Sequence, residues 1–298
     1  MNSPLNRLAE LGADYRDPMR VIDWDSGDVD LPWLPHGMLS LGGAEEELPA
    51  DVLVQLSRIE LARICAAGLW VEGLLISKIS TLSYPKINID ETRVMLSEVR
   101  EEAGHGLMFL KMIRRAGLEN VPLLGSTWLL TAIARMLPAD SAEFWALVYI
   151  GESVTDTFAV KALQQSLTEN NEICPLVRQV LSFHHRDEAR HIAAARALLE
   201  MRVAALTSSR KAAVAAGLKW LLPRFIDATL YPTEASLASL GLNNPGEQAV
   251  AARKCPKRRA MVHSFSASAC KFLSGLGLGE VSVLKPPLFS KGRSDELA

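Results

Sequence analysis

The octapeptide HHRDEARH, at positions 184–191, decides how the rest of this sequence is interpreted. It holds Glu188 and His191 three residues apart, and the chain has just one other Glu-x-x-His match, formed by Glu102 and His105. Residues at i and i+3 share one face of a helix, so each match places a carboxylate beside an imidazole. Two such pairs on neighbouring helices are what a dinuclear metal site in a helical bundle requires.

Long helical segments are expected around both pairs. Apolar residues recur at helical spacing from Asp51 to about Ile79, and a second helix should run from an N-cap at Asp90 to a C-cap at Gly117. Further helices are expected over about 127–136, 141–167, 175–206, 209–227 and 245–275, with turns at 83–88 and 168–171. The sequence therefore predicts an all-α protein built on four long helices in two antiparallel hairpins.

Two isolated glutamates lie in apolar surroundings on the other two long helices. They are Glu72, within GLWVEGLLI, and Glu152, after LVYIG. A buried carboxylate without a partner is costly, and a metal is one such partner. The midpoint between Glu72 and Glu102 is position 87, and that between Glu152 and Glu188 is position 170, so both midpoints fall in expected turns. Antiparallel hairpins would therefore bring each pair to the same level.

Other residues were ranked by the same register argument. Glu60 gives a midpoint with Glu102 near a helix end and ranks lower, whereas Asp156 competes with Glu152 or lies in a second layer. His184 precedes Glu188 by four residues and shares its face, while His185 is rotated away by about 100°. The predicted metal ligands are Glu72, Glu102, His105, Glu152, His184, Glu188 and His191. Oxygen and nitrogen ligands suit iron or manganese more than zinc.

Each residue also has a simpler interpretation. The acidic cluster at positions 98–102 could be a solvated helix face, and His184 alone would more often be a satisfied core histidine. The two isolated glutamates could instead form ion pairs with Lys78 and Lys161. These readings would all have to coincide with the observed spacing and register, so the metal site is favoured.

The composition excludes several functional classes. The 298 residues are 49% hydrophobic and 22% charged, with a net charge of −2, which does not suit a nucleic-acid-binding protein. Four cysteines without C-x-x-C spacing fit a reducing cytoplasm and read as buried small hydrophobes. No secretory signal and no apolar run of about 18 residues is present, so no membrane partner is expected.

These motifs resemble the ferritin-like di-iron N-oxygenases typified by p-aminobenzoate N-oxygenase. HHRDEARH looks like that family's His-x-Arg-Asp-Glu-x-x-His segment, including its additional histidine, and EEAGHGLMF at positions 101–109 is similar to its second-helix segment. Glu72 and Glu152 occupy the places of its two lone glutamate ligands. Phe265-Ser266 and the LGL at 276–278 fall where the family has related segments, so the resemblance covers about residues 48–280.

The resemblance implies a ferritin-like helical bundle with additional flanking helices. Residues 1–48 would form an irregular N-terminal arm packed on the body, and residues 49–298 a single di-iron domain. Two iron ions, with manganese as the second choice, would use dioxygen and an electron donor or reductase. Family members oxidise an amine to a hydroxylamine and onward to nitroso or nitro. We therefore expect a cytoplasmic biosynthetic monooxygenase acting on a small-molecule or carrier-bound amine, and a homodimer is compatible with this reading.

One departure from the family concerns the substrate. Members that act on aminobenzoate-like acids place an arginine, suited to a carboxylate, before their Asp-Phe-Ser segment, whereas here the stretch begins with His263. The substrate is thus expected to lack a carboxylate, to be carrier-bound or to be an aliphatic amine, unless His263 is an ordinary buried histidine. Asp156, Asp187, Tyr149 and His263 are the candidates for a second layer or a substrate pocket.

Two other functions stay open at the level of sequence. One is a di-iron hydroxylase or desaturase that acts on carbon, because ferritin-like sites support both chemistries. The other is a metal-storage protein or a non-catalytic scaffold, although storage proteins of this fold are usually shorter. By resemblance alone, the additional His184 favours oxidation of nitrogen.

Overall fold

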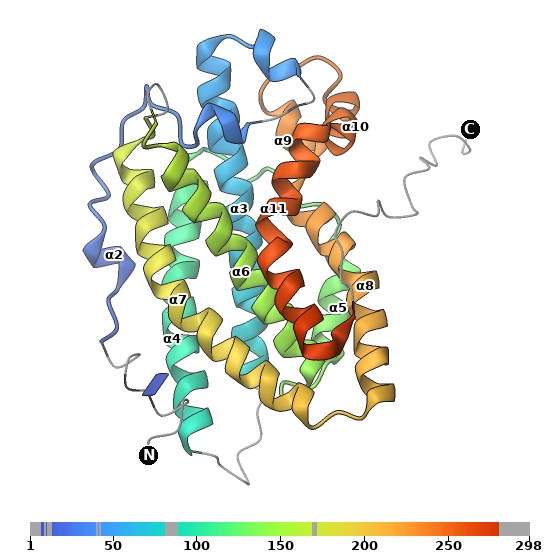
Figure 1. The fold of residues 1–298 in the computed structure, drawn as a ribbon. Helices are drawn as coiled ribbons and strands as arrows, with labels where there is room; N and C mark the ends of the chain where they lie inside the picture. The colour runs from blue at the N-terminus through green and yellow to red at the C-terminus, as the bar shows by residue number, and fades with distance from the viewer. Residues whose placement is uncertain are drawn as a thin grey trace.

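The computed structural model describes residues 7–8, 10, 14–39, 41, 43–80, 89–168 and 172–279. At its centre lie four long helices (Figure 1): α3 (Ala50–Ile79), α4 (Ile89–Arg115), α6 (Ala142–Gln165) and α7 (Pro175–Ala204). α3 packs along α4 and α6 along α7, and the two hairpins meet through α3 with α6 and α4 with α7. All regular structure in the described part of the chain is helical. The predicted ferritin-like bundle is therefore confirmed.

Additional helices cover one side of this bundle. They are α5 (Trp128–Met136), α8 (Ser208–Leu230), α9 (Glu234–Ala238), α10 (Pro245–Lys254) and α11 (Pro256–Leu273), which ends in a π-helical turn, η3 (Ser274–Leu278). The prediction of one continuous helix over 245–275 is wrong. Proline disfavours helical backbone at the residue before it, so Cys255 is extended and Pro256 starts a new helix.

The helix ends follow from local chemistry. The Ser141 side chain accepts a hydrogen bond from the Phe144 N–H and caps α6. Gly117 adopts a φ of +70° after α4, which a residue without Cβ tolerates best. Asp90 is not an N-cap as predicted, because α4 already begins at Ile89 and Asp90 lies in its first turn. The predicted turn at 83–88 lies outside the described residues, as do positions 169–171 of the second turn.

The described part of the N-terminal arm is mostly irregular, with three short helices, α2 (Pro18–Val21), η1 (His36–Met38) and η2 (Ala44–Glu47). Its apolar side chains belong to the same core as the bundle: Ile22, Trp24, Trp33, Leu34, Met38, Leu39 and Leu41 are all buried in it. This shared core supports our proposal that residues 49–298 form one domain on which the arm packs.

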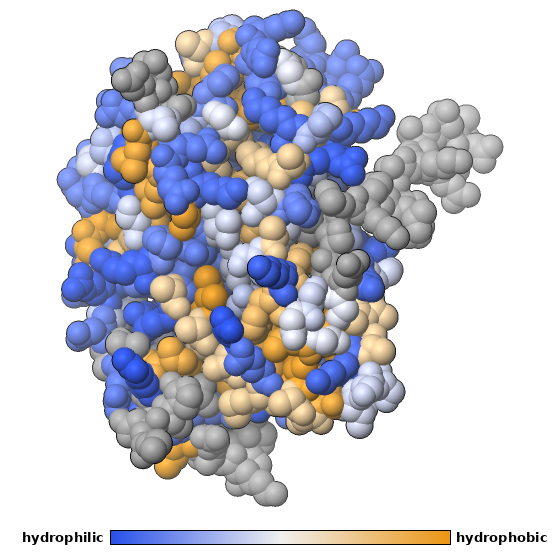
Figure 2. All heavy atoms as spheres, in the orientation of Figure 1, coloured by the Kyte–Doolittle hydropathy of each residue, from blue (hydrophilic) through white to orange (hydrophobic). Residues whose placement is uncertain are grey.

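The surface combines polar and apolar regions. Figure 2 shows apolar residues gathered in the lower half of one face, beneath a mainly hydrophilic upper half. Among the large apolar side chains that are exposed are Trp128 and Met136 on α5 and Trp220 on α8. Within the described ranges, none of the helices combines the length and apolar character that spanning a bilayer needs.

A buried ion pair ties α11 to α3. Nη1 and Nη2 of Arg258 donate to Oε1 and Oε2 of Glu60 at 2.8 and 2.9 Å, and Arg63 lies 3.7 Å from the same carboxylate. Burial by itself raises the pKa of Glu60, but the two guanidinium groups more than offset it, so the pKa lies below its usual value of 4.5. Glu60 is thus partnered within the protein.

Replacing Arg258 by methionine should show how strongly the buried Glu60 carboxylate depends on its arginine partner. Arg258→Met leaves the Glu60 carboxylate poorly compensated in the core, so we expect the free energy of unfolding to fall by about 3–5 kcal/mol at neutral pH. The loss should shrink as the pH falls through the pKa of Glu60, because protonation removes the charge that Arg258 compensates.

Denaturant unfolding across pH measures both effects. Arg210→Met is the control, since Arg210 pairs with Glu143 at an exposed site, and it should cost about 1 kcal/mol or less. Equal losses in the two variants would contradict the role given to the buried pair.

Candidate metal centre

The seven predicted ligand residues lie in the middle of the bundle and are buried. α3 contributes Glu72, α6 contributes Glu152, and α4 and α7 each contribute one Glu-x-x-His pair. The carboxylates of Glu102 and Glu188 are 0% exposed. The solvated-face interpretation of the acidic cluster is therefore wrong, because Glu98 and Glu101 are buried as well.

Two overlapping groups of ligand atoms converge in this space. One atom each from Glu102, His105, Glu188 and His191 lie within 4.8 Å of one another, as do atoms from Glu72, His105 and His184. His105 belongs to both groups: its Nδ1 lies 3.2 Å from Glu102, 3.8 Å from Glu188 and 3.9 Å from Glu72. Nδ1 of His191 lies 3.0 Å from Oε1 of Glu102. We call these residues, together with Glu152, the cage.

His184 also reaches the cage. Its Nε2 lies 2.9 Å from Oε1 of Glu188 and 4.0 Å from Oε1 of Glu72. His185 points away, is partly exposed, and contacts Asp156 with Nδ1 and Oδ1 2.5 Å apart. Asp156 is thus occupied by His185 and does not take the place of Glu152 among the cage residues.

Glu152 is buried beside the two groups without belonging to either. Burial, and then the carboxylates of Glu188 and Glu102, raise its pKa well above the ordinary value. Lys161 does not pair with it, because the Lys161 ammonium donates to Ser264 Oγ. Lys78, the lysine considered for the other isolated glutamate, Glu72, donates to the Arg135 carbonyl oxygen, and among the described residues Glu72 lies in ion-pair range of histidines only. The ion-pair alternative is therefore wrong for both glutamates.

In each Glu-x-x-His pair, the histidine nitrogen that faces away from the other ligands contacts a carboxylate on the other helix of the α4–α7 pair. Nε2 of His191, on α7, lies 2.9 Å from Oε2 of Glu101, on α4. Nε2 of His105, on α4, lies 3.5 Å from Oδ2 of Asp187, on α7. An N–H on Nε2 that donates to these carboxylates leaves the Nδ1 lone pair facing the cage. We call this arrangement the crossed brace.

Asp187 was among the predicted neighbours of the site, whereas Glu101 and Glu98 were not. The signal was present, because an acidic residue directly precedes the glutamate of both pairs, Glu101 before Glu102 and Asp187 before Glu188. Glu98 lies one turn before Glu102 on the same face, 3.9 Å from Nε2 of His191. Burial raises the pKa of Glu98 to about 7.

Two other candidates do not reach the cage. His263 is exposed, because the buried face of α11 is formed by Val262, Phe265 and Ser266, so the buried-histidine reading is wrong and its place in a substrate pocket stays a prediction. Tyr149 is buried, but its ring packs on Phe272 with the centroids 4.7 Å apart.

The electrostatics of the cage show an excess of buried negative charge. Burial and then Glu102 raise the pKa of Glu72 well above its usual value. Burial acts in the same direction on Glu102, but His191 and His105 outweigh it and lower the pKa of Glu102 to about 2. Burial opposes charge on His105 too, yet the hydrogen bonds to Asp187 and Glu102 raise its pKa to about 10. Without cations, protons compensate the carboxylates.

The residues present fit divalent metal ions. Several buried polar atoms make no well-directed hydrogen bond: Glu72 Oε2, Glu102 Oε1, Glu152 Oε1, both carboxylate oxygens of Glu188, and His191 Nδ1. Imidazole nitrogens lie close to two of these oxygens, at 3.0 Å from Glu102 Oε1 and 2.9 Å from Glu188 Oε1, but not in hydrogen-bonding geometry. Buried lone pairs without donors cost free energy, and cations in the cage would satisfy them. Carboxylate and imidazole ligands suit iron and manganese.

Comparison with known proteins gives one family. A family model described as P-aminobenzoate N-oxygenase AurF matches residues 4–277. An uncharacterized protein of Mycobacterium tuberculosis strain CDC 1551 is 25% identical over 227 residues, which cover 74% of this chain and 66% of that protein. Uncharacterized proteins of Mycobacterium bovis and of Mycobacterium tuberculosis strain H37Rv are each 26% identical over 203 residues, 65% of this chain and 59% of theirs.

The chain therefore aligns with less than two thirds of the length of these curated relatives. No solved structure gives a significant match.

The excess of buried negative charge in the cage predicts that the Glu152 carboxyl destabilises the protein when no metal is bound. In Glu152→Gln we expect the free energy of unfolding of chelator-treated protein to rise, because the substitution removes a carboxyl whose pKa is raised by burial and by Glu188 and Glu102. A carboxyl whose pKa is raised by folding destabilises the protein increasingly as the pH rises above the pKa of that carboxyl in the unfolded chain. The increase in the free energy of unfolding caused by Glu152→Gln should therefore be larger at about pH 8 than at about pH 5.

Denaturant unfolding with and without ferrous ion, under anaerobic conditions, measures this prediction. The exposed Glu200→Gln is the control and should change little. Ferrous ion should stabilise wild-type protein more than Glu152→Gln. If Glu152→Gln destabilises the metal-free protein, the electrostatic account of the cage is wrong.

The crossed brace predicts a second effect. Glu101→Ala frees the His191 ring to rotate, so we expect the affinity for ferrous ion to fall about 10–100-fold. Asp187→Ala should act in the same way through His105, whereas the exposed Glu119→Ala should leave the affinity unchanged. Anaerobic competition with a coloured chelator measures the three affinities, and equal values would contradict an orienting role.

Proposed function

The chain belongs to the P-aminobenzoate N-oxygenase AurF family, and on that premise we propose that it is a di-iron monooxygenase that oxidises the nitrogen of an amine with dioxygen. The observation that carries this proposal is the cage, in which buried carboxylate and imidazole lone pairs have no other partner. His184 is the one cage histidine that the two Glu-x-x-His pairs do not account for.

In this proposal the cage residues are the ligands of two iron ions, with manganese as the second choice: Glu72, Glu102, His105, Glu152, His184, Glu188 and His191. Bound iron would supply the reduction and activation of dioxygen. The four carboxylates would neutralise two divalent cations, and the crossed brace would hold two of the imidazoles in the required orientation.

Aromatic side chains keep water away from the cage. The Phe109 ring lies 5.1 Å from the His184 ring, and Phe183 meets His105 edge-on at 6.3 Å. Both phenylalanines are buried. Excluding water strengthens the electrostatic interactions of the cage and protects an oxidation from competing hydrolysis.

A small cavity beside His184 is the proposed place for the amine. Its volume is about 20 Å³, and its walls come from α3, α4, α6 and α7. The Thr155 hydroxyl is engaged by carbonyls of its own helix, and burial followed by Glu72 raises the pKa of the Cys65 thiol, which keeps it neutral. An amine nitrogen fits this volume, whereas an aromatic ring requires Phe109 or Phe158 to rotate.

The lining also bears on the substrate class. No cationic side chain of arginine or lysine lines this cavity in the described part of the chain. A substrate carboxylate placed here would lose its hydration without a partner. We therefore take the group that enters beside His184 to be uncharged and apolar around the nitrogen. The remainder of a small or carrier-bound amine would extend away from the cage.

Several further features complete the proposal. Monooxygenation with dioxygen consumes electrons from outside the site, so an electron donor or reductase is included. The four cysteines are free thiols, three buried and Cys270 half-buried, which supports a reducing compartment such as the cytoplasm. A homodimer and a biosynthetic role are included as expectations from the family.

Metal analysis followed by an amine panel tests the function. We expect about two iron ions per chain, as a dinuclear bundle site requires, and oxygen uptake that depends on an amine and yields an N-oxidised product by mass spectrometry. His184→Ala should lower turnover about 100-fold or more, because it removes a proposed ligand. His185→Ala, on the exposed face, should have nearly wild-type activity.

The outcomes separate the alternatives. Full metal content and activity in His184→Ala would contradict the seven-ligand assignment. A product oxidised on carbon would support a hydroxylase or desaturase, and iron uptake with mineral growth that ignores the amine would support storage.

A further inference from the structure

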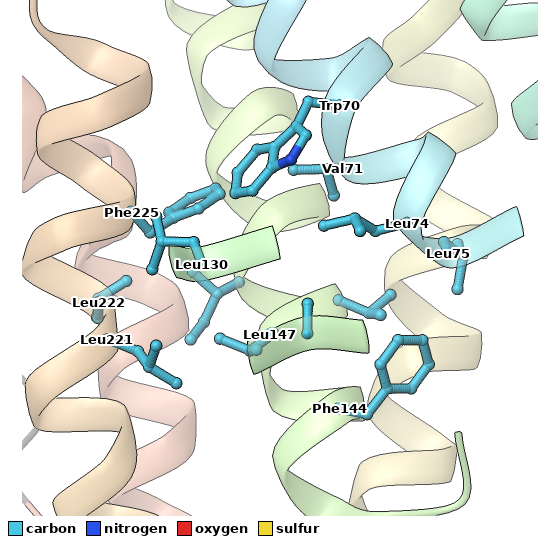
Figure 3. A pocket seen from close by; sticks show the side chains of 13 residues that line it. Trp70, Val71, Leu74, Leu75, Leu130, Phe144, Leu147, Leu221, Leu222 and Phe225 are labelled. Carbon is cyan, nitrogen blue, oxygen red and sulfur yellow. The ribbon is translucent and has the colours of Figure 1, made fainter. Parts of the chain in front are cut away.

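A second cavity lies between α3, α5, α6 and α8 and is lined by apolar side chains (Figure 3). Its volume is about 60 Å³. Trp70 is the one lining residue with a polar side-chain atom, and its Nε1–H donates to Thr131 Oγ1 at 2.9 Å. The lining side chains thus offer water no hydrogen-bond partner, and apolar cavities of this kind stay dry.

The inner wall of this cavity borders the cage. Leu75 lies one turn after Glu72 on α3, and Val148 lies one turn before Glu152 on α6. These spacings put each lining residue on the same helix face as a cage carboxylate. Figure 1 shows that α3 and α6 run antiparallel. A residue after Glu72 on α3 and one before Glu152 on α6 therefore lie toward the same end of the cage.

The outer end of the cavity lies near the surface. Trp70 and Phe225 are half-buried and stack across α3 and α8, with ring centroids 6.0 Å apart. Leu74 and Leu147 are half-buried as well, whereas Leu75 and Val148 are buried. The cavity therefore reaches from near solvent toward the cage, on a different side of α3 from the cavity next to His184.

The volume of this cavity and its apolar lining limit which molecules can occupy it. A dry cavity of about 150 Å³ lined by leucine, isoleucine and phenylalanine accepts benzene or xenon. The smaller volume here leaves room for a molecule smaller than benzene. An amine or another hydrogen-bonding substrate would lose its hydration without compensation. A diatomic apolar gas has no such hydration to lose.

We propose that this cavity holds dioxygen and supplies it to the cage by a route separate from that of the amine. The proposal rests on the proposed function, because it requires a centre that consumes dioxygen. It assigns to Leu75 and Val148 the boundary that dioxygen crosses, and to the pair of Trp70 and Phe225 the outer wall.

Xenon under pressure probes the cavity without any metal in the cage. Ala134, on α5, lines the cavity and is 8% exposed, and Ala134→Leu should fill it. Ala249, on α10, is 6% exposed and lies outside the cavity, so Ala249→Leu is the matched control. Crystals of wild-type and Ala249→Leu protein should show xenon in the cavity, and those of Ala134→Leu should not.

The rate of reaction with dissolved dioxygen tests the supply route. In stopped-flow mixing of reduced, iron-loaded protein, Ala134→Leu should lower the rate constant for dioxygen about tenfold, as a barrier raised by ~1.4 kcal/mol does. The KM for the amine should stay at its wild-type value, and Ala249→Leu should match wild type in both. Should Ala134→Leu not fold, Leu221→Ala enlarges the cavity and should raise the rate constant.

The outcomes are distinct. Absence of xenon from the wild-type cavity overturns the proposal. Xenon in the cavity with rate constants that neither substitution changes overturns the supply route and leaves the proposed function intact. Iron-loaded wild-type protein that fails to consume dioxygen, with xenon still bound, overturns the proposed function and with it dioxygen as the occupant.

Discussion

Buried negative charge at the centre of the bundle is the constraint on which the rest of this structure depends. Carboxylates of Glu72, Glu102, Glu152 and Glu188 are buried together, and within the described residues none of them forms an ion pair with a lysine or arginine. In the protein alone, protons do so, as the raised pKa of Glu72 and Glu152 and of the facing imidazoles shows. Cations are the alternative, and the free lone pairs already point to where they would bind. Without a ligand, the fold would lose stability at Glu72 and Glu152, whose pKa is raised in the folded protein.

The same helix shows what compensation within the protein looks like. Glu60 and Glu72 are both buried residues of α3, separated by twelve positions along the helix. Glu60 receives a bidentate hydrogen bond from Arg258, and it holds α11 against the bundle. The charged and titratable groups that act on Glu72 among the described residues are imidazoles and other carboxylates, with no arginine or lysine. An arginine partner thus makes a buried glutamate a structural residue, whereas the lack of one leaves its oxygens available to a metal.

The crossed brace links the stability of the bundle to the geometry of the cage. Glu101 on α4 holds His191 on α7, and Asp187 on α7 holds His105 on α4, so neither histidine is oriented by its own helix alone. The contacts that join the two hairpins at this level thus also orient the site. The proposed routes for amine and dioxygen approach this fixed centre through separate apolar cavities, and both exclude water from it.

The sequence by itself determined the helical bundle, the pairing of its hairpins and the residues that gather in the cage. These follow from short-range periodicity and from register about a turn, which depend on residues close together in the chain. Only the tertiary structure decided the roles of Glu101 and Glu60, because their partners lie 90 and 198 residues away on other helices. It also placed His263 in solvent, because α11 packs through the face that carries Val262, Phe265 and Ser266, and the residue pattern of one helix does not fix which face meets the bundle.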